Sequence, residues 1–141
     1  MDIQECLEKR YLIKEEVRKD LIDKEIKECN YDLGKAKETF SSGDHKWSIV
    51  QCYYSMFHSA KAVCFKQGYR EKRHFAVLIV LEDLNKKGKL EVRFVNDFGA
   101  AISAREGADY RYAYSEERAE QSLKMAEEFN KRMKELLKNN L

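Results

Sequence analysis

The chain has 141 residues, of which 43% are hydrophobic and 37% charged, with six glycines and no proline. A chain of this length forms a single domain and can bury a core without disulfides or a structural metal. The low content of turn-forming residues excludes a sandwich or barrel of many short strands and favours helices joined by short connections. We therefore expect one all-α domain spanning residues 1–141.

The charge of the chain is nearly balanced, but it is unevenly distributed. The formal net charge is only +2, which by itself gives no reason to expect a nucleic-acid ligand. From Lys61 to Arg93, however, nine basic residues outnumber four acidic ones, whereas the first forty residues contain eleven acidic and nine basic residues. This local excess indicates either an ordinary solvated surface or a patch that faces a polyanion.

The cysteines and the N-terminal segment indicate the compartment. Four cysteines stand at positions 6, 29, 52 and 64, with no CxxC spacing and no histidine in a metal-ligand pattern beside them. We expect reduced, mostly buried thiols, no metal site and no cofactor. The N-terminal residues do not form a signal peptide, and no apolar stretch is long enough to cross a bilayer. These features predict a cytoplasmic protein that does not bind a membrane.

Turn signals divide the chain into five helical stretches. The first runs from near the N-terminus to Phe40, with apolar residues at three- and four-residue intervals and a break expected near Ile13. The second runs from about Asp44 to Gln67 and is apolar on almost every side. Because such a helix must be covered all round, we expect it at the centre of the domain, with one side available to a second subunit.

The last three helices follow after short connections. The third spans roughly Arg73 to Lys86; its run Ala-Val-Leu-Ile-Val-Leu has strand propensity, but the polar residues that continue it favour a buried helix. The fourth spans about Leu90 to Arg105. The fifth begins after Ser115, a good N-cap that two glutamates follow in the first turn. This order predicts an up-and-down bundle of about five helices.

The connection expected between the fourth and fifth helices contains the first group of candidate functional residues. Arg105 is followed by Gly107, Asp109 and Tyr110, and two more tyrosines follow on alternate positions. Tyrosine hydroxyls are costly to bury without partners. A purely structural role would also explain this composition: an arginine–aspartate ion pair would stabilise the loop, and the tyrosine rings would pack against the end of the bundle. The alternative is a binding or catalytic site.

The second predicted helix contains another candidate group. Tyr54, His58 and Lys61 are spaced so that they share one face of the helix. A single histidine on an apolar helix is usually a hydrogen-bonded core residue, but these polar neighbours also fit a functional site. The chain lacks a glycine-rich phosphate loop, GxSxG, HExxH and paired-cysteine zinc patterns. Any catalysis would therefore come from Arg, His and Tyr acting on a charged substrate.

Two segments of the sequence resemble those of HEPN-domain proteins. Residues 52–62, CYYSMFHSAKA, resemble the YYAMFHAA(R/K)A helix of that family, and His74 follows the next loop as in its members. Residues 105–110, REGADY, resemble the RxxADY signature of one small-HEPN subfamily. These patterns cover about residues 43–129. The resemblance implies a HEPN-like helical bundle, a homodimer, and a minimal nucleotidyltransferase as a frequent partner in toxin–antitoxin-like pairs.

The resemblance also implies an activity. Many HEPN proteins are metal-independent ribonucleases, whose motif is an arginine, four to six intervening residues and then a histidine, at the dimer cleft. Here Arg105 occupies the arginine position, but Tyr110 stands where the histidine is expected. Tyrosine has a pKa near 10 and is a poor general base at neutral pH. By its offset from Arg105, Tyr112 matches the tyrosine that partner nucleotidyltransferases adenylylate in related systems, and Tyr110 or Tyr114 could serve in its place.

Three functions follow as hypotheses. The first is a toxin-like or accessory component that acts with a minimal nucleotidyltransferase and binds nucleotide or RNA in a cleft near Arg105. The binding residues predicted for this cleft are Tyr54, Lys61, Asp109 and Tyr110. The second is a metal-independent ribonuclease with Arg105 and His58 as catalytic residues. The third is a non-enzymatic dimeric interaction module.

Overall fold

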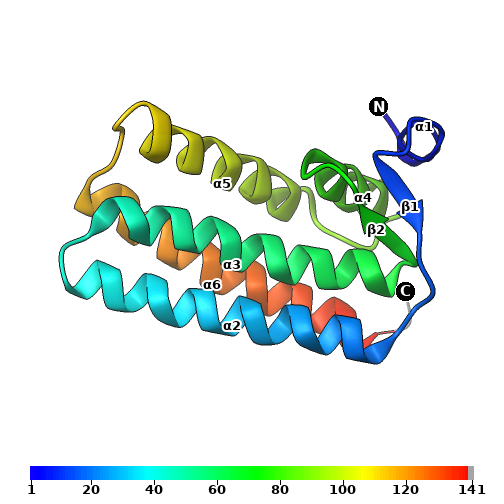
Figure 1. Ribbon diagram of the computed structural model, residues 1–141, viewed down its shortest axis with the longest axis horizontal. Coiled ribbons are helices and arrows are strands. Elements are labelled where there is room, and N and C mark those ends of the chain that lie inside the picture. Colours follow the sequence, from blue (N-terminus) through cyan, green and yellow to red (C-terminus); the bar gives the residue numbers. More distant parts are fainter. Residues whose placement is uncertain (140–141) are drawn as a thin grey trace.

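The computed structural model describes residues 1–139, which form six helices and one two-stranded sheet. In chain order, the elements are α1 (Ile3–Glu8), β1 (Leu12–Lys14), α2 (Lys19–Ser41), α3 (His45–Lys66), β2 (Tyr69–Glu71), α4 (Phe75–Lys86), α5 (Val92–Tyr110) and α6 (Glu116–Lys138). The four long helices α2, α3, α5 and α6 form an up-and-down bundle, and α1, α4 and the sheet lie together at one end (Figure 1). The predicted all-α fold is confirmed.

Helix α3 is the central helix, as its sequence predicts. It packs against α2, α5 and α6 and buries 14 of its 22 residues. The Asp44 side chain caps its start by accepting the N–H of Trp47 at 3.2 Å, and Gly68 follows its end with a φ of 85°. Glycine adopts this left-handed conformation without a steric penalty, so the chain can turn sharply toward β2.

The core of the bundle contains aromatic, aliphatic and a few polar side chains. The Phe98 and Phe129 rings stack with centroids 5.7 Å apart, which joins α5 to α6. Each large side chain buried in this way stabilises the fold by about 1.5–3 kcal/mol relative to its exposed state. Deep between α3 and α6, the side chains of Ser55, Ser59 and Asn130 form a buried hydrogen-bonded group.

Helix α5 extends further than the sequence predicts. The fourth helix was expected to end at Arg105, with a turn around Gly107, but α5 continues to Tyr110. Gly107 is buried, and its carbonyl accepts the N–H groups of Arg111 and Ala113 at 3.1 and 2.9 Å. Burial of the next residue, Ala108, in a small core cluster with α3 and α6 favours a helical backbone here. Arg105 and Asp109 consequently lie one turn apart on the same helix.

The small sheet was not predicted, although the break expected near Ile13 is present. Residues Leu12–Lys14 pair antiparallel with Tyr69–Glu71, with Leu12 opposite Glu71. Strands of three residues are too short to show the alternating pattern by which a strand is recognised in a sequence. The pairing attaches the N-terminal segment to the connection that leads from α3 to α4.

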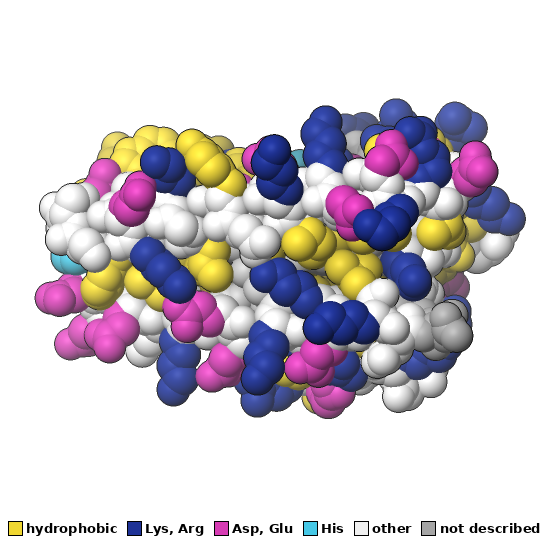
Figure 2. Space-filling view, turned by 90° about the horizontal axis from the view of Figure 1, so that it is seen from below, with side chains coloured by type: hydrophobic (Ala, Val, Ile, Leu, Met, Phe, Trp, Pro, Cys, Tyr) yellow, Lys and Arg dark blue, Asp and Glu magenta, His cyan; other side chains and the backbone are white. Residues whose placement is uncertain are grey.

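The face that includes α2, the lowest helix in Figure 1, is covered with charged side chains of both signs (Figure 2). This mixture is typical of a solvated helix surface. All four cysteines are free thiols and buried, as predicted. Within residues 1–139, no helix has both the length and the apolar composition needed to cross a bilayer.

Candidate functional site

The guanidinium group of Arg105 lies among three tyrosine rings between α3 and α5. Its central carbon is 5.7 Å from the ring centroid of Tyr53, 5.6 Å from that of Tyr54 and 6.0 Å from that of Tyr110. These distances are within the range of cation–π attraction. Nη2 also donates a hydrogen bond of 3.3 Å to the Tyr54 hydroxyl. Together with Asp109, these residues form what we call the Arg105 cluster.

The Asp109 carboxylate forms the ion pair of the cluster. Its Oδ2 lies 3.3 Å from Nε of Arg105, and both side chains are about a quarter or less exposed. The distance satisfies an ion pair, but the alignment does not make a hydrogen bond, and Nε is buried without a hydrogen-bond partner. A guanidinium group has five N–H donors, and the hydrogen bonds found within residues 1–139 use one of them. The tyrosine rings and the Asp109 carboxylate therefore hold Arg105 in place without satisfying all of its donors.

The three tyrosines differ in their exposure. Tyr53 is only 3% exposed and forms the floor of the cluster, whereas Tyr110 is 70% exposed at its edge. Burial raises the pKa of Tyr53 to about 12, although the nearby charge of Arg105 acts in the opposite direction. Tyr53 therefore stays protonated at neutral pH and cannot serve as a general base.

His58 and Lys61 belong to a second cluster, which is centred on Glu25 of α2. Nδ1 of His58 lies 2.6 Å from a Glu25 carboxylate oxygen, and Nε2 lies 3.5 Å from the Asp32 carboxylate. Nζ of Lys61 lies 3.5 Å from Glu25 and 3.3 Å from Glu71. We call these five residues the Glu25 network.

Charge pairing dominates the Glu25 network. The hydrogen bond to Glu25 raises the pKa of His58, although burial opposes this shift. Burial of Glu25 would raise the pKa of its carboxyl group, but the His58 hydrogen bond and the Lys61 charge outweigh it, so the pKa is lowered. Both shifts favour the ionised forms of the two partners.

The residues predicted from sequence thus separate into two groups. Tyr54, Arg105, Asp109 and Tyr110 meet in the Arg105 cluster. His58 and Lys61 share the α3 face of Tyr54, but they contact carboxylates of α2 and β2. Among the hydrogen bonds and ion pairs of residues 1–139, none joins either of them to Arg105.

Tyr112 lies beyond the Arg105 cluster, in the connection between α5 and α6. It is 77% exposed, and its φ of 54° is a left-handed conformation that is uncommon for a residue other than glycine. Sequence reasoning missed Tyr53 and Glu25 as members of the two clusters. Tyr53 could have been found because it stands directly beside Tyr54 in the sequence. Glu25 could not, because it is one of many acidic residues on a charged helix and its spacing does not distinguish it.

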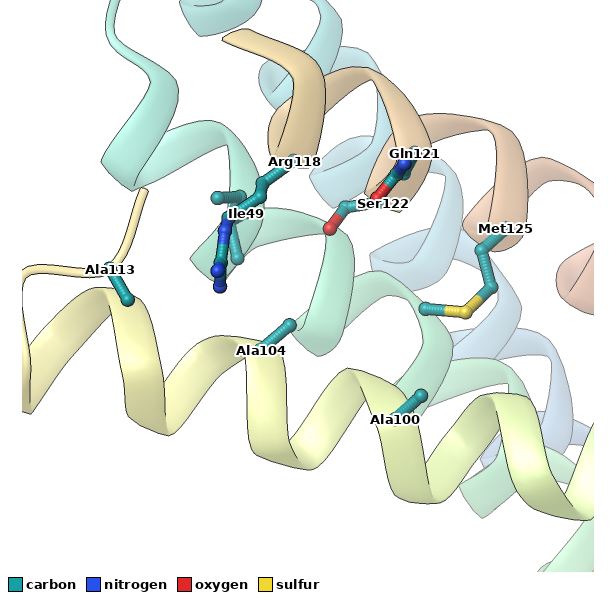
Figure 3. A pocket seen from close by; sticks show the side chains of 8 residues that line it. All are labelled: Ile49, Ala100, Ala104, Ala113, Arg118, Gln121, Ser122 and Met125. Atoms are coloured by element: carbon teal, nitrogen blue, oxygen red, sulfur yellow. The ribbon is translucent and has the colours of Figure 1, made fainter. Parts of the chain in front are cut away.

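A separate cavity of about 330 Å³ lies between α3, α5 and α6 (Figure 3). Ile49, Met125 and three alanines give it an apolar lining, and the side chains of Arg118 and Ser122 point into it. None of the residues predicted from sequence lines this cavity. No group of three or more His, Cys, Asp or Glu side chains in the described part of the chain is arranged to hold a metal ion.

The family model described as "HEPN domain" matches residues 22–136. A protein named "Putative toxin MJ0605", from Methanocaldococcus jannaschii, is 30% identical over 131 residues, which cover 85% of this chain and 97% of that protein. "Putative toxin MJ0142" of the same organism is 27% identical over 90 residues, which cover 63% of this chain and only 61% of that protein. "UPF0332 protein PH1297", from Pyrococcus horikoshii, is 35% identical over 57 residues, 40% of each chain.

Proposed function

Because this chain belongs to the HEPN-domain family, we propose that it is the toxin-like component of a nucleotidyltransferase–HEPN pair. In this proposal, the Arg105 cluster binds a nucleotide or RNA. The observation that supports it best is the Arg105 guanidinium group, which three tyrosine rings hold near the surface with most of its donors unused.

The chemistry of the cluster suits a nucleotide. Phosphate oxygens accept charge-assisted hydrogen bonds from a guanidinium group, and its planar fork can bind two of them at once. Exposed aromatic rings such as Tyr110 provide surfaces on which bases stack without sequence preference. Asp109 balances the charge of Arg105 when no ligand is bound, so an incoming phosphate competes with this carboxylate for the guanidinium group.

Ligand binding tests the proposal directly. Titration calorimetry would compare AMP and a short single-stranded RNA on the wild-type protein, Arg105→Ala and Arg105→Lys. Losing hydrogen bonds to a charged group costs about 1.5–3 kcal/mol, so we expect Arg105→Ala to weaken binding at least about tenfold. Arg105→Lys should retain part of the affinity, because it keeps the charge but not the planar fork. Arg93→Ala, which removes an exposed arginine paired with Glu128, is the matched control and should bind normally. Equal affinity of Arg105→Ala and wild type would contradict the proposal.

The partner enzyme would act on an exposed tyrosine. We propose Tyr112 as the acceptor of the adenylyl group, because this residue is 77% exposed and lies just beyond the end of α5. The hydroxyl oxygen would attack the α-phosphorus of ATP, lose its proton to solvent, and displace pyrophosphate to leave a tyrosyl-AMP. Incubation with ATP and a minimal nucleotidyltransferase should add the mass of one adenylyl group. Tyr112→Phe should abolish the addition, whereas Tyr114→Phe should not; the reverse result would move the acceptor to Tyr114.

A metal-independent ribonuclease with His58 and Arg105 as catalytic residues is the second candidate. The observation in its favour is the 2.6 Å contact between Nδ1 of His58 and Glu25, since a carboxylate commonly orients a histidine base. Cleavage of RNA in the presence of a chelator should then be lost in both His58→Ala and Arg105→Ala. Cleavage that persists in both variants would point to a contaminating nuclease.

We further propose that the protein is a homodimer, whose interface would lie near the Arg105 cluster. Exposed aromatic residues on or beside α3 and α5 support this arrangement: Trp47 is 49% exposed, and Tyr110 and Tyr112 are 70% and 77% exposed. Light scattering at micromolar concentration should give twice the mass of one chain. A monomer would refute the dimer, and a dimer without any ligand affinity would favour a non-enzymatic interaction module.

A further inference from the structure

His74, at the start of α4, and Arg105, on α5, both contact the buried side chain of Tyr53. Its Nδ1 lies 3.4 Å from the hydroxyl of Tyr53, and its ring stacks on Phe57 with centroids 4.3 Å apart and an interplanar angle of 29°. The guanidinium carbon of Arg105 lies 5.7 Å from the ring centroid of the same Tyr53. Because Tyr53 is only 3% exposed, Arg105 and His74 both help to cover it, from different elements of the fold.

The surroundings of His74 differ from those of His58. Both ring nitrogens of His58 face carboxylates, on Glu25 and Asp32. His74 is exposed, and the side-chain contacts found for it within residues 1–139 are those to Tyr53 and Phe57. Phe57 packs on one face of the imidazole ring, and the exposure of His74 leaves the remainder of the ring in contact with solvent.

The charges around this surface favour an anion on balance. Exposed Lys72 and Arg73 precede His74, whereas Asp109 pairs with Arg105 and exposed Glu106 follows it on α5, so three cationic side chains face two anionic ones. A planar ring beside a guanidinium group can bind the two parts of a nucleotide separately. The guanidinium group pairs with the phosphate, and the ring stacks on the base.

We infer that His74 and Arg105 form a two-point site for a nucleoside monophosphate unit, whether free or within single-stranded RNA. Arg105 binds the phosphate, and the exposed face of the His74 ring stacks on the base. Tyr53 fixes the spacing between them through its hydroxyl and its ring. This inference rests on the proposed function, because it takes the phosphate-binding role of Arg105 from there, and it adds His74 as the residue that recognises the base.

The test compares a ligand that has a base with one that lacks it. AMP and ribose 5-phosphate would be titrated into the wild-type protein, His74→Ala, His74→Phe and Arg105→Ala. We expect His74→Ala to weaken AMP binding about fivefold or more and to leave ribose 5-phosphate binding unchanged. His74→Phe should keep the affinity for AMP, because a benzene ring also stacks on a base. His45→Ala, which removes a histidine whose ring lies 5.7 Å from Phe40, is the matched control and should bind both ligands normally.

The outcomes separate the inference from the proposed function. If Arg105→Ala loses AMP binding while His74→Ala keeps it, the role of His74 is wrong and the proposed function stands. Equal weakening of both ligands by His74→Ala would refute base stacking, provided that circular dichroism shows the variant to be folded. If Arg105→Ala binds AMP as wild type does, both the proposed function and the inference fail. If wild type binds no AMP, the inference fails, and the proposed function fails with it only if single-stranded RNA does not bind either.

Discussion

Asn130 joins α6 to α3 through hydrogen bonds in the interior of the bundle. Its amide Nδ2 donates to the Ser55 hydroxyl at 2.8 Å, and its Oδ1 accepts from the Ser59 hydroxyl at 2.7 Å. Ser55 in turn donates to the carbonyl of Cys29 on α2 at 2.8 Å, so that one polar group ties three helices together. Asn130 is 2% exposed and both serines are fully buried.

The substitution Asn130→Ala removes both side-chain hydrogen bonds of this residue. Each contributes about 1 kcal/mol net, and the removed amide leaves a small void beside Ser55, so we expect a loss of about 2–3 kcal/mol. The two hydroxyls can still donate to the carbonyls of Met56 and Cys29, which limits the cost. For 141 residues, the entropy of unfolding is about 0.3 kcal/mol/K, so the melting temperature should fall by about 7–10 °C.

Calorimetry or circular dichroism would measure this change in Asn130→Ala, Ser59→Ala and the double variant. Because Asn130 and Ser59 share a bond, the double variant should lose about 1 kcal/mol less than the sum of the single variants. Arg93→Ala, which breaks an exposed ion pair with Glu128, should shift stability by less than about 0.5 kcal/mol. An Asn130→Ala melting temperature within 2 °C of wild type, or strict additivity with Ser59→Ala, would refute the reasoning.

Three further predictions follow from other contacts. Asp109→Asn removes a negative charge 3.3 Å from Arg105. The attraction between these two charges is worth about 1 kcal/mol in water, so the affinity for AMP measured by calorimetry should rise about fivefold when the carboxylate no longer competes with the phosphate. Weaker binding would instead mean that the carboxylate positions the guanidinium group. Glu25→Gln should lower the pKa of His58 in an NMR titration of its ring, because the hydrogen bond to Glu25 is the main cause that raises it. The stabilisation from this raised pKa is complete below about pH 6.5 and is lost as pH rises through the folded-state value, so the stability gap between wild type and Glu25→Gln should narrow from pH 6 to pH 9. Ser115→Ala removes the side chain that caps α6 and should destabilise the protein by about 1 kcal/mol in thermal unfolding, and an unchanged melting temperature would contradict the role of the cap.

Most of the fold could be predicted from local signals. The apolar character of residues 44–67 identified the central helix, because a helix without a polar side must be covered all round. Ser115 identified the start of α6, where its hydroxyl accepts the N–H of Arg118 at 3.1 Å. The end of α5 was predicted too early. Glycine at position 107 is a turn signal in the sequence, whereas its burial depends on how the helices pack and cannot be seen in the sequence.

The sequence by itself determined the helical class, the central helix and the residues that resemble the HEPN family, because these depend on residue type and on spacing along one helix. Only the tertiary structure decided which of these residues meet. Tyr54 and His58 are one turn apart on α3, yet one contacts Arg105 of α5 and the other Glu25 of α2. The tertiary structure also brings His74, at the start of α4, into contact with Tyr53, whose ring Arg105 covers from α5. Spacing along a helix fixes the direction in which a side chain points, whereas packing between helices decides which group it contacts.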